Sequence, residues 1–513
     1  MSRFSITTPI FYVNAPPHIG HAYTVVAADV LARFHRLRGD EVFFLTGTDE
    51  HGAKIAEAAK GAGQAPQVFA DRISAEFQAV WQALDVRLDD FIRTTETRHA
   101  QGVNTALTEL QRKGVLYEKS YQGLYCTGCE NFLTEKDLDA SGKCPLHNRK
   151  PEVVEERNWF FKISQYLADV KVLIQRDVIR VGPEERKNEV LGLFEQGLDD
   201  FSVSRSKARV GWGIPLPFDD TQTTYVWVDA LLNYLTALGY GSGDTTRLDR
   251  YWPADVHMIG QDILKFHAVY WPALLLALGL ENPKEIFVHG FFTVDGRKVS
   301  KSLGNAIDPL ALVTRYGSDA ARFLLLSQFP FGTSGDVNVA RFDEQYNAIL
   351  ANTIGNLVSR TIALLQKFSD GKIPDAPADH TFSQTVLAEK KSVEEATSPG
   401  NLLDALVREP VQLAIALNQY ADRTAPWKET DPAKRATALR TLADGVVSLA
   451  LLAEPVLPRA SPAIQTAFGV VNRQRPTPGT TVRSTDPAIL FPRAKDLQHR
   501  ESLSAPDTLS GST

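Results

Sequence analysis

The amino-terminal segment follows the order strand, helix, strand, and this order constrains the fold more than any other feature of the chain. Residues 3–13 are rich in Ile, Phe, Tyr, Thr and Val, as a buried strand is, and 41–45 form a second apolar run. Between them, over 21–38, apolar residues recur at helical spacing. Such a unit closes right-handed onto a parallel sheet, with a ligand crevice at the carboxyl ends of its strands. We therefore expect an α/β fold with a binding site after these strands.

The rest of the chain changes pattern several times. Residues 113–224 are irregular, with Gly/Pro turns and a Cys/His cluster, which indicates an insertion between two halves of one fold. Strand-like runs at 225–228, 256–260 and 286–288 form the second half. Ala- and Leu-rich helical runs then predict a bundle, and a Pro-, Ser- and Thr-rich end predicts disorder. The predicted domains are 1–112, the first half of a Rossmann-like domain; 113–224, the insertion; 225–330, the second half; 331–345, a linker; 346–470, an all-α domain; and 471–513, a largely disordered tail.

The bulk composition is that of a soluble globular protein. With 513 residues, 43% hydrophobic and 23% charged, the chain is long enough for several packed domains, and we expect no apolar run to approach the ~20 residues of a membrane span. The chemistry-bearing stretch begins as early as Thr7, so we expect no cleaved leader and a cytoplasmic location. The net charge of −6 argues against nucleic-acid binding through bulk positive charge, so an RNA would be recognised locally.

Two histidines flank a glycine directly after the first predicted strand, in the string His18-Ile19-Gly20-His21. Backbone N–H groups at a helix N-terminus favour phosphate oxygens, and Gly20 admits a close approach. The two imidazoles can donate hydrogen bonds to a pentacovalent phosphate, which is the stabilisation that phosphoryl chemistry requires. The alternative interpretation is that both histidines cap the helix.

A second string, Lys-Val-Ser-Lys-Ser at 298–302, begins 280 positions after His18. It lies in a glycine-bounded stretch, 295–305, with three cations, which suits a loop that closes over a triphosphate and neutralises a leaving pyrophosphate. Lys301 is the first candidate for that role. The alternative is a solvated basic loop.

Together, in this order and at this separation, the two strings resemble the paired ATP-handling signatures of class I aminoacyl-tRNA synthetases. Further stretches narrow the resemblance to the methionyl-tRNA synthetase family, of the bacterial type with a single zinc knuckle, from about Ser5 to Ala467. The chain departs from the family pattern at Val299, where methionine is usual, and at Gln261, where lysine is common. The matching stretches are Thr7–Asn14, Thr46–Gly52, Tyr225–Tyr234 and Ile259–His267.

The resemblance implies an enzyme that activates L-methionine with ATP, accompanied by Mg²⁺, and transfers methionine from the adenylate to the 3′ end of a tRNA. The implied partners are ATP, L-methionine and both initiator and elongator tRNA(Met). Asp262 would secure the ATP ribose or the local network. The ATP-binding residues that the resemblance implies are His18, Gly20, His21, Asp262, Lys298, Ser300, Lys301 and Ser302, of which His18, His21, Lys298 and Lys301 would be catalytic.

Two helical stripes suit a pocket for a thioether side chain. Positions 227, 231 and 234 lie at i, i+4 and i+7, and 263, 267 and 271 follow at steps of four, so each set shares one helix face. Aromatic edges contact sulfur favourably, by ~0.3–1.5 kcal/mol, while length and shape add selection. The alternative is plain hydrophobic core. The resemblance implies that Asp49 holds the substrate ammonium and that the pocket is lined by Ile10, Tyr12, Trp227, Ala230, Leu231, Tyr234, Ile263 and His267.

The cysteines of the chain all belong to one short pattern. Cys126-x-x-Cys129 is followed, after fourteen intervening residues, by Cys144-x-x-His147, the paired spacing of a closed tetrahedral Zn²⁺ site. With no open coordination position the metal would be structural. The alternative is reduced cysteines in a loop.

One face of the bundle carries residues suited to an unpaired base. Asn352, Asn356 and Arg360 fall at i, i+4 and i+8, beside Gly355. A second stretch, around 418–427, places an indole after a proline-broken helix, which suits base stacking. Without the resemblance this would be an ordinary bundle surface. With it, the implied anticodon-binding residues are Asn352, Asn356, Arg360, Asn418, Pro426 and Trp427.

Two other functions stay open at this point. One is a different class I synthetase, although the leucine, isoleucine and valine enzymes need a large editing domain and the insertion here has only about 110 residues. The other is a non-catalytic RNA-binding paralogue. Because only about 40 residues follow the bundle, we expect a monomer.

Overall fold

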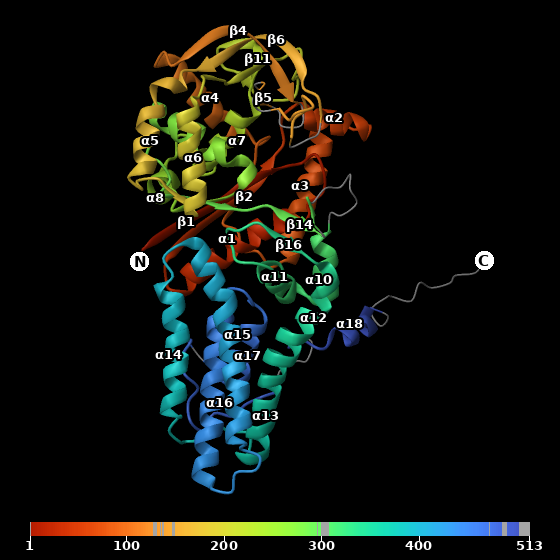
Figure 1. Ribbon diagram of the computed structural model, residues 1–513, viewed down its shortest axis with the longest axis vertical. Helices are drawn as coiled ribbons and strands as arrows, with labels where there is room; N and C mark the ends of the chain where they lie inside the picture. Colours follow the sequence, from red (N-terminus) through yellow and green to blue (C-terminus); the bar gives the residue numbers. More distant parts are fainter. Residues whose placement is uncertain are drawn as a thin grey trace, which may run out of the picture. The chain divides into compact units, whose positions relative to one another are not determined.

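The structure is a computed structural model that describes residues 2–126, 131–133, 135, 138–145, 149–294, 296–298, 307–470, 472–484 and 490–501. By its internal contacts the chain forms two compact units, each made of several segments. The first unit comprises Met1–Pro17, Ala32–Trp81 and Arg87–Gly290, and the second comprises His18–Leu31, Gln82–Val86 and Phe291–Thr513. Figure 1 follows the chain through its helices and strands.

A parallel sheet is the framework of the first unit. Its strand order is β3-β2-β1-β12-β13-β7, and all neighbouring strands run parallel. After β1, the strands β2 and β3 are added on one side of β1, and β12 and β13 are later added on its other side. The direction in which strands are added therefore reverses between β1 and β12. Ligands of such sheets bind at the carboxyl ends of the strands at this reversal. The strands are β1 Arg3–Tyr12, β2 Glu41–Asp49, β3 Asp90–Arg93, β7 Arg180–Gly182, β12 Val256–Gly260 and β13 Glu285–His289.

The predicted strand, helix, strand order is confirmed. Helix α1 spans Ile19–Leu37 and connects β1 to β2, and Val25, Val26 and Val30 are fully buried along it. Within the first unit, α4 packs against α7 and α9. Residues 19–31 of α1 belong to the second unit, and the last two residues of α3 lie beyond the segment of the first unit that ends at Trp81. The helices of the first unit are α2 Ala53–Gly61, α3 Pro66–Ala83, α4 Thr97–Arg112, α5 Leu167–Gln175, α6 Glu184–Gln196, α7 Val226–Thr236, α8 Thr246–Tyr251 and α9 Trp271–Leu278.

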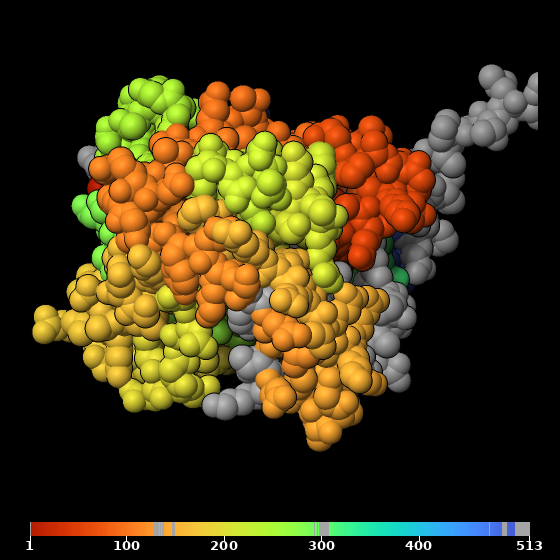
Figure 2. All heavy atoms as spheres, turned by 90° about the horizontal axis from the view of Figure 1, so that it is seen from above, coloured from red at the N-terminus to blue at the C-terminus, as the bar shows by residue number. Residues whose placement is uncertain are grey.

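The segment predicted as an insertion is not wholly separate from the main sheet. Its strand β7 pairs with β13 as an edge strand, and three residues between two helices are too few to predict as a strand. The other strands of the segment form antiparallel sheets in the orders β5-β4-β6-β8 and β10-β11-β9. Residues of 113–224, coloured orange to yellow-green, occupy much of the face shown in Figure 2. These strands are β4 Leu116–Cys126, β5 Asn131–Leu133, β6 Glu152–Phe161, β8 Phe201–Ser202, β9 Ser204–Ser206, β10 Pro215–Leu216 and β11 Asp219–Thr224.

One strand prediction in the second half is wrong. Residues 225–228 were expected as a strand, but α7 begins at Val226, and the strand is the preceding polar run β11. Almost every residue of α7 is buried, so it has no exposed polar face, and a short segment that is buried all round looks the same as a strand in sequence. The strands predicted at 256–260 and 286–288 are present as β12 and β13.

From Phe291 on, the second unit contains a small sheet of order β15-β14-β16 and a series of helices. The segment predicted as a linker, 331–345, contains β16 and the start of a long helical stretch. The strands are β14 Phe292–Val294, β15 Arg297–Lys298 and β16 Gly335–Val337. The helices are α10 Pro309–Tyr316, α11 Ser318–Leu326, α12 Phe342–Gln345, a π-helical stretch Tyr346–Gly355, α13 Asn356–Phe368, α14 His380–Glu395, α15 Pro399–Thr424, α16 Pro432–Ala453, α17 Ala460–Ala467 and α18 Ala494–Glu501.

The helices of the bundle begin and end where the sequence is broken by prolines. The Ser398 hydroxyl accepts a hydrogen bond from the Asn401 N–H at 3.2 Å and starts α15, while Asp431 caps α16 in the same way. Ala425 adopts a left-handed backbone, φ 39°, and ends α15. The fold class predicted from the sequence, a Rossmann-like α/β domain followed by an all-α bundle, is confirmed.

The predicted disorder after 471 is wrong for 472–484 and 490–501. The Ile373 N–H donates to the Thr480 carbonyl at 3.0 Å, and the Ala494 N–H donates to the Asn347 side chain at 2.9 Å. Val482 and Phe491 are buried. Isolated apolar residues in a polar segment give no periodic pattern, which is why the sequence did not predict this packing.

Two helical stretches, 339–368 and 432–453, are long and apolar enough to cross a membrane by length and composition. The expectation that no stretch approaches a span is therefore wrong on this criterion. However, 56% and 67% of their apolar windows are buried inside the protein, as in the core helices of a bundle.

Candidate functional site

The two signature histidines lie at the start of α1, and both rings accept backbone hydrogen bonds there. The Gly20 N–H donates to Nδ1 of His18 at 3.1 Å, and the His18 N–H donates to Nδ1 of His21 at 3.3 Å. The rings stack with centroids 3.8 Å apart. Because each Nδ1 accepts a hydrogen bond, a neutral ring carries its proton on Nε2 and is a donor there. The histidines therefore cap the helix, and the same capping sets their tautomers for hydrogen-bond donation.

Gly20 lies close to the His18 ring. A Cβ atom at this position would lie 3.0 Å from Cε1 of His18, tighter than nine in ten real contacts. A larger residue would therefore need the His18 imidazole to shift by a few tenths of an ångström.

The chain that follows the second signature meets the start of α1 within the same unit. The Ile19 N–H donates to the carbonyl oxygen of Ile307, which follows the lysine string, at 3.1 Å. Lys298 lies in β15, opposite Thr293 of β14, and Asp336 accepts hydrogen bonds from the Thr293 hydroxyl at 2.7 Å and the Gly296 N–H at 2.8 Å. The Lys298 side chain and residues Val299, Ser300, Lys301 and Ser302 lie outside the described part of the chain.

Helix α1 is held in place by a fully buried arginine of α11. The guanidinium of Arg322 pairs with Asp29 of α1 at 2.7 Å, and neither side chain is exposed. It also donates to the carbonyls of Leu84, Pro455 and Val456 at 2.9 to 3.2 Å. A buried charge with every partner in place fixes the position of α1 in the second unit.

The residues predicted for the methionine pocket come together at the carboxyl ends of the first unit's strands. Tyr12 is directly opposite Asp49 in the register of β1 and β2, and the Val13 N–H donates to the Asp49 carbonyl at 3.2 Å. Ile10, opposite Gly47, is half-buried like Tyr12, whereas Asp49 is buried.

Aromatic rings form one wall of this region. Trp227 of α7 stacks on Phe266 with centroids 3.8 Å apart and meets the Tyr12 ring edge-on at 6.1 Å. Phe266 was not among the residues predicted for the site, although it precedes His267 in a family-matching stretch. It lies in a π-helical turn, 266–270, a geometry that is frequent at functional sites.

A neutral hydrogen-bonded pair forms the other wall. The His267 ring donates from Nδ1 to the Ile263 carbonyl at 3.0 Å, so its Nε2 accepts the Tyr234 hydroxyl proton at 2.8 Å. Burial lowers the pKa of His267 to about 4 and raises the pKa of Tyr234. Ala230 and Leu231 are buried beside them on α7, and Ile263 is half-buried. Both side chains of the Tyr234–His267 pair are thus aromatic and uncharged.

Asp262 lies in a short turn, 261–263, directly after β12. It is exposed, as a ribose ligand would need to be. Burial lowers the pKa of His289 at the end of β13, and the charge of Asp262 opposes that shift.

Of the predicted zinc ligands, Cys126 and Cys144 are described, and both are buried. Cys126 ends β4, and the Cys144 N–H donates to the Arg149 carbonyl at 2.9 Å. Cys129 and His147 lie outside the described residues, and the described ones alone contain no group of three or more metal-binding side chains.

The residues predicted for the anticodon gather on helices of the second unit. Asn352 and Asn356 are exposed, and the guanidinium of Arg360 lies over the Trp427 ring at 4.4 Å and pairs with Asp422 at 2.8 Å. Pro426 is buried next to the half-buried Trp427.

Asn418 is more constrained than predicted. Its amide nitrogen donates to the carbonyls of Thr353 at 3.1 Å and Ala414 at 2.9 Å, so both N–H groups are engaged and only the amide oxygen remains for another partner.

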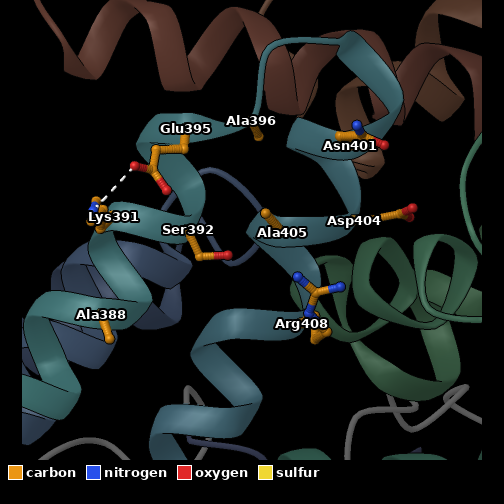
Figure 3. A pocket seen from close by; sticks show the side chains of 9 residues that line it. All are labelled: Ala388, Lys391, Ser392, Glu395, Ala396, Asn401, Asp404, Ala405 and Arg408. Carbon is orange, nitrogen blue, oxygen red and sulfur yellow. Dashed lines mark ion pairs between the residues drawn. The ribbon is translucent and has the colours of Figure 1, made fainter.

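A hollow of about 480 Å³ lies elsewhere in the second unit, between α14 and α15 (Figure 3). None of the predicted site residues lines it. Its charged side chains pair with their neighbours: Lys391 with Glu395 at 3.3 Å, and Arg408 with Glu409 at 2.6 Å. Its lining residues are Ala388, Lys391, Ser392, Glu395, Ala396, Asn401, Asp404, Ala405 and Arg408.

Known proteins resemble this chain along most of its length. A family model described as class I tRNA synthetases (M) matches residues 4–150 and 140–362. A methionine–tRNA ligase from Thermosynechococcus vestitus is 44% identical over 91% of this chain and 90% of its own length, and one from Nostoc is 42% identical over the same shares. Among solved structures, methionyl-tRNA synthetase from Mycobacterium tuberculosis in complex with methionyl-adenylate matches 96% of this chain and 100% of its own, with 36% identity and a TM-score of 0.89.

Proposed function

Because this chain belongs to the methionyl-tRNA synthetase family of class I aminoacyl-tRNA synthetases, ligases that join methionine to tRNA, we propose how its residues divide that reaction. The enzyme activates L-methionine with ATP to methionyl adenylate and transfers methionine to the 3′ end of tRNA(Met). In the first step a carboxylate oxygen of methionine attacks the α-phosphorus, and the bond to pyrophosphate breaks.

The two signature histidines stabilise the charge that develops on the α-phosphate. Their Nε2–H groups are the donors, since each Nδ1 already accepts a backbone N–H. Lys298 and Lys301 neutralise the leaving pyrophosphate, with Gly20, Ser300 and Ser302 as further ATP contacts, and Mg²⁺ accompanies ATP. No covalent bond to the enzyme forms, so catalysis consists of positioning and charge stabilisation.

Methionine binds between the aromatic wall and the neutral Tyr234–His267 pair. Asp49 holds the ammonium group, and Ile10, Tyr12, Trp227, Ala230, Leu231 and Ile263 surround the side chain. A near-isostere without sulfur loses the sulfur–aromatic contact, while a branched side chain does not match the shape. Asp262 secures the ATP ribose.

A structural Zn²⁺ is held by Cys126, Cys129, Cys144 and His147. The two described thiols fit this role, because both are buried and neither forms a disulfide. The metal would tie the ends of the Cys/His segment together and would not touch the substrates.

The second unit reads the anticodon of initiator and elongator tRNA(Met). Arg360, stacked on Trp427, and the exposed amides of Asn352 and Asn356 support this role, since RNA bases are read by stacking and by amide hydrogen bonds. The Asn418 oxygen and the backbone turn at Pro426 complete the surface.

The enzyme acts as a cytoplasmic monomer without a membrane. Its two apolar helical stretches are bundle cores, as their burial supports.

The observation that carries this assignment is the Ile19–Ile307 hydrogen bond, which joins a residue of the first signature to the chain that follows the second. Pyrophosphate exchange into ATP, measured with each amino acid in turn, tests it, and we expect stimulation by methionine alone. Stimulation by leucine or valine instead would indicate a different class I specificity, and tRNA binding without any exchange would indicate a non-catalytic paralogue.

A further inference from the structure

A buried carboxylate lies on α7, the helix that also carries Trp227 and Tyr234 of the proposed methionine pocket. Asp229 is on α7, two residues after Trp227 and one before Ala230, and its side chain has no exposed surface. A buried carboxylate that is not compensated destabilises a protein, so its partners decide what it does.

Both oxygens of this carboxylate bind imidazoles from other elements of the same unit. Nδ1 of His51, which follows β2, lies 2.7 Å from one oxygen, and Nε2 of His99, on α4, lies 2.7 Å from the other. Nδ1 of His99 is 2.7 Å from the Thr236 hydroxyl at the far end of α7. Burial would raise the pKa of Asp229, but the charge and hydrogen bond of His51, together with those of His99, outweigh it and lower the pKa to about 2.

The cluster connects the elements that carry the methionine residues. His51 is two residues after Asp49, and its ring meets Trp212 edge-on, while the Gly52 N–H donates to the Trp212 carbonyl at 3.0 Å. Helix α4 approaches α7 so closely that a Cβ atom on Gly102 would lie 2.4 Å from the Thr236 side chain. The loop after β2 and helix α7 are thus joined through a single carboxylate.

We propose that Asp229, His51 and His99 form a positioning cluster that sets the place of Asp49 relative to α7, and through it the affinity for methionine. This inference rests on the proposed function of the pocket. The three residues are positioning residues, since they act through Asp49 and the α7 side chains. Misplacement of a binding group by as little as an ångström weakens a site strongly, so the effect appears in methionine binding.

Substituting asparagine or glutamine for a histidine tests the cluster, because each amide can replace the N–H of only one of the two imidazole nitrogens. Asparagine places its N–H₂ near the position of Nδ1, and glutamine places it near Nε2. We expect His51→Asn to keep the KM for methionine within about threefold, and His51→Gln to raise it on the order of tenfold to a hundredfold, as loss of a hydrogen bond to a charged group would. At position 99 the order reverses, so that His99→Gln is tolerated and His99→Asn is not.

The measurement is methionine-dependent pyrophosphate exchange, with the KM for methionine, the KM for ATP and kcat determined separately. His35→Gln is the matched control, because His35 also binds a carboxylate through Nδ1, that of Asp40 at 2.8 Å, outside the pocket. Its three constants should equal those of the unmodified enzyme. A rise confined to the KM for methionine, with the reversed preference at the two positions, supports the proposal.

Several outcomes overturn it. They are equal effects of Asn and Gln at each position, a KM for ATP that rises in parallel, and a fall in kcat alone. If the histidine variants do not fold, Thr236→Val, which removes only the outer hydrogen bond of His99, decides: an unchanged dissociation constant for L-methionine contradicts the proposal, and a raised one supports it. If the unmodified enzyme shows no exchange with methionine, the function of the pocket itself is wrong, which is a distinguishable result.

Discussion

The proposed methionine pocket and the proposed anticodon surface each contain a half-buried tryptophan, but the surroundings of the two rings differ. Trp227 stacks on an apolar ring, beside the neutral Tyr234–His267 pair. Trp427 lies under the guanidinium of Arg360, which is also paired with the exposed Asp422. The first site is built from groups whose charge and position are fixed, whereas the second has contacts that water and ions can exchange. This difference fits the proposed roles, since the first surroundings suit the selection of a small ligand by shape and the second suit a large charged one.

Among the variants that test this comparison, Trp227→Ala should have the largest effect. Removing a wall of the pocket should raise the KM for methionine about 100-fold, because both the stacking contact and the shape are lost. Pyrophosphate exchange measures this change, and the affinity for tRNA, from filter binding, should stay the same. A comparable loss of tRNA affinity would mean that the two sites are not independent.

The reciprocal change, Trp427→Ala, should spare exchange and impair charging. Base stacking on an aromatic ring contributes ~1–3 kcal/mol, so kcat/KM for tRNA(Met) should fall about tenfold to a hundredfold. The measurement is aminoacylation at subsaturating tRNA, with exchange kinetics as the control. Normal charging would refute the role of this tryptophan.

The stability of the bundle should depend on pH in a range where methionine binding in the proposed pocket does not. Burial, together with the hydrogen bond and negative charge of Glu409, raises the pKa of Glu389 to about 7. Between the unfolded value of 4.5 and about pH 7 the folded chain holds a proton that the unfolded chain has released, so stability falls as the pH rises through this window.

Glu389→Gln removes this proton linkage. We expect the variant to unfold a few degrees higher than the unmodified enzyme at pH 8, and to differ less at pH 5. Thermal unfolding followed by circular dichroism at both values measures the difference. Glu395→Gln, on the same helix but paired with Lys391, is the matched control and should show no such dependence. Equal behaviour of the two variants would contradict the prediction.

The smallest expected effect is in the pocket. Since the pKa of His267 is lowered to about 4, below its unfolded value of 6.5, this ring stays neutral from pH 6 to 8. The KM for methionine should therefore show no step that belongs to His267 in this range. His267→Gln serves as the comparison, because a step that is present in the unmodified enzyme and absent in the variant would assign a charge to this ring.

The sequence predicted the parallel sheet and the bundle because their patterns are regular and long. The spacing of apolar residues differs between the first strand and α1, and the bundle helices are delimited by prolines and by capping residues such as Ser398 and Asp431. It did not predict β7, which is three residues long, or the start of α7, which is buried on all sides. Local patterns carry no information about such elements, since tertiary contacts decide them.

For the site, residue types were predicted better than their partners. The stripe at positions 227, 231 and 234 was visible from its spacing, but Phe266 was not, because a π-helical turn shifts the phase of the helix that carries it. The engagement of both N–H groups of Asn418 was equally hidden, since the carbonyl it meets at Thr353 lies 65 positions away in the chain. The roles of the site residues were predicted from the family resemblance, whereas their contacts could be seen only in the folded structure.

The buried guanidinium of Arg322 implies that this position accepts no other cation. A lysine could supply the charge that Asp29 needs, but its single nitrogen cannot also reach the carbonyls of Pro455 and Val456 in the directions that the planar fork provides. Those oxygens would then be left in a dry interior without donors. The placement of the helix that begins with the signature histidines thus depends on the geometry of one side chain far along the chain, as well as on its charge.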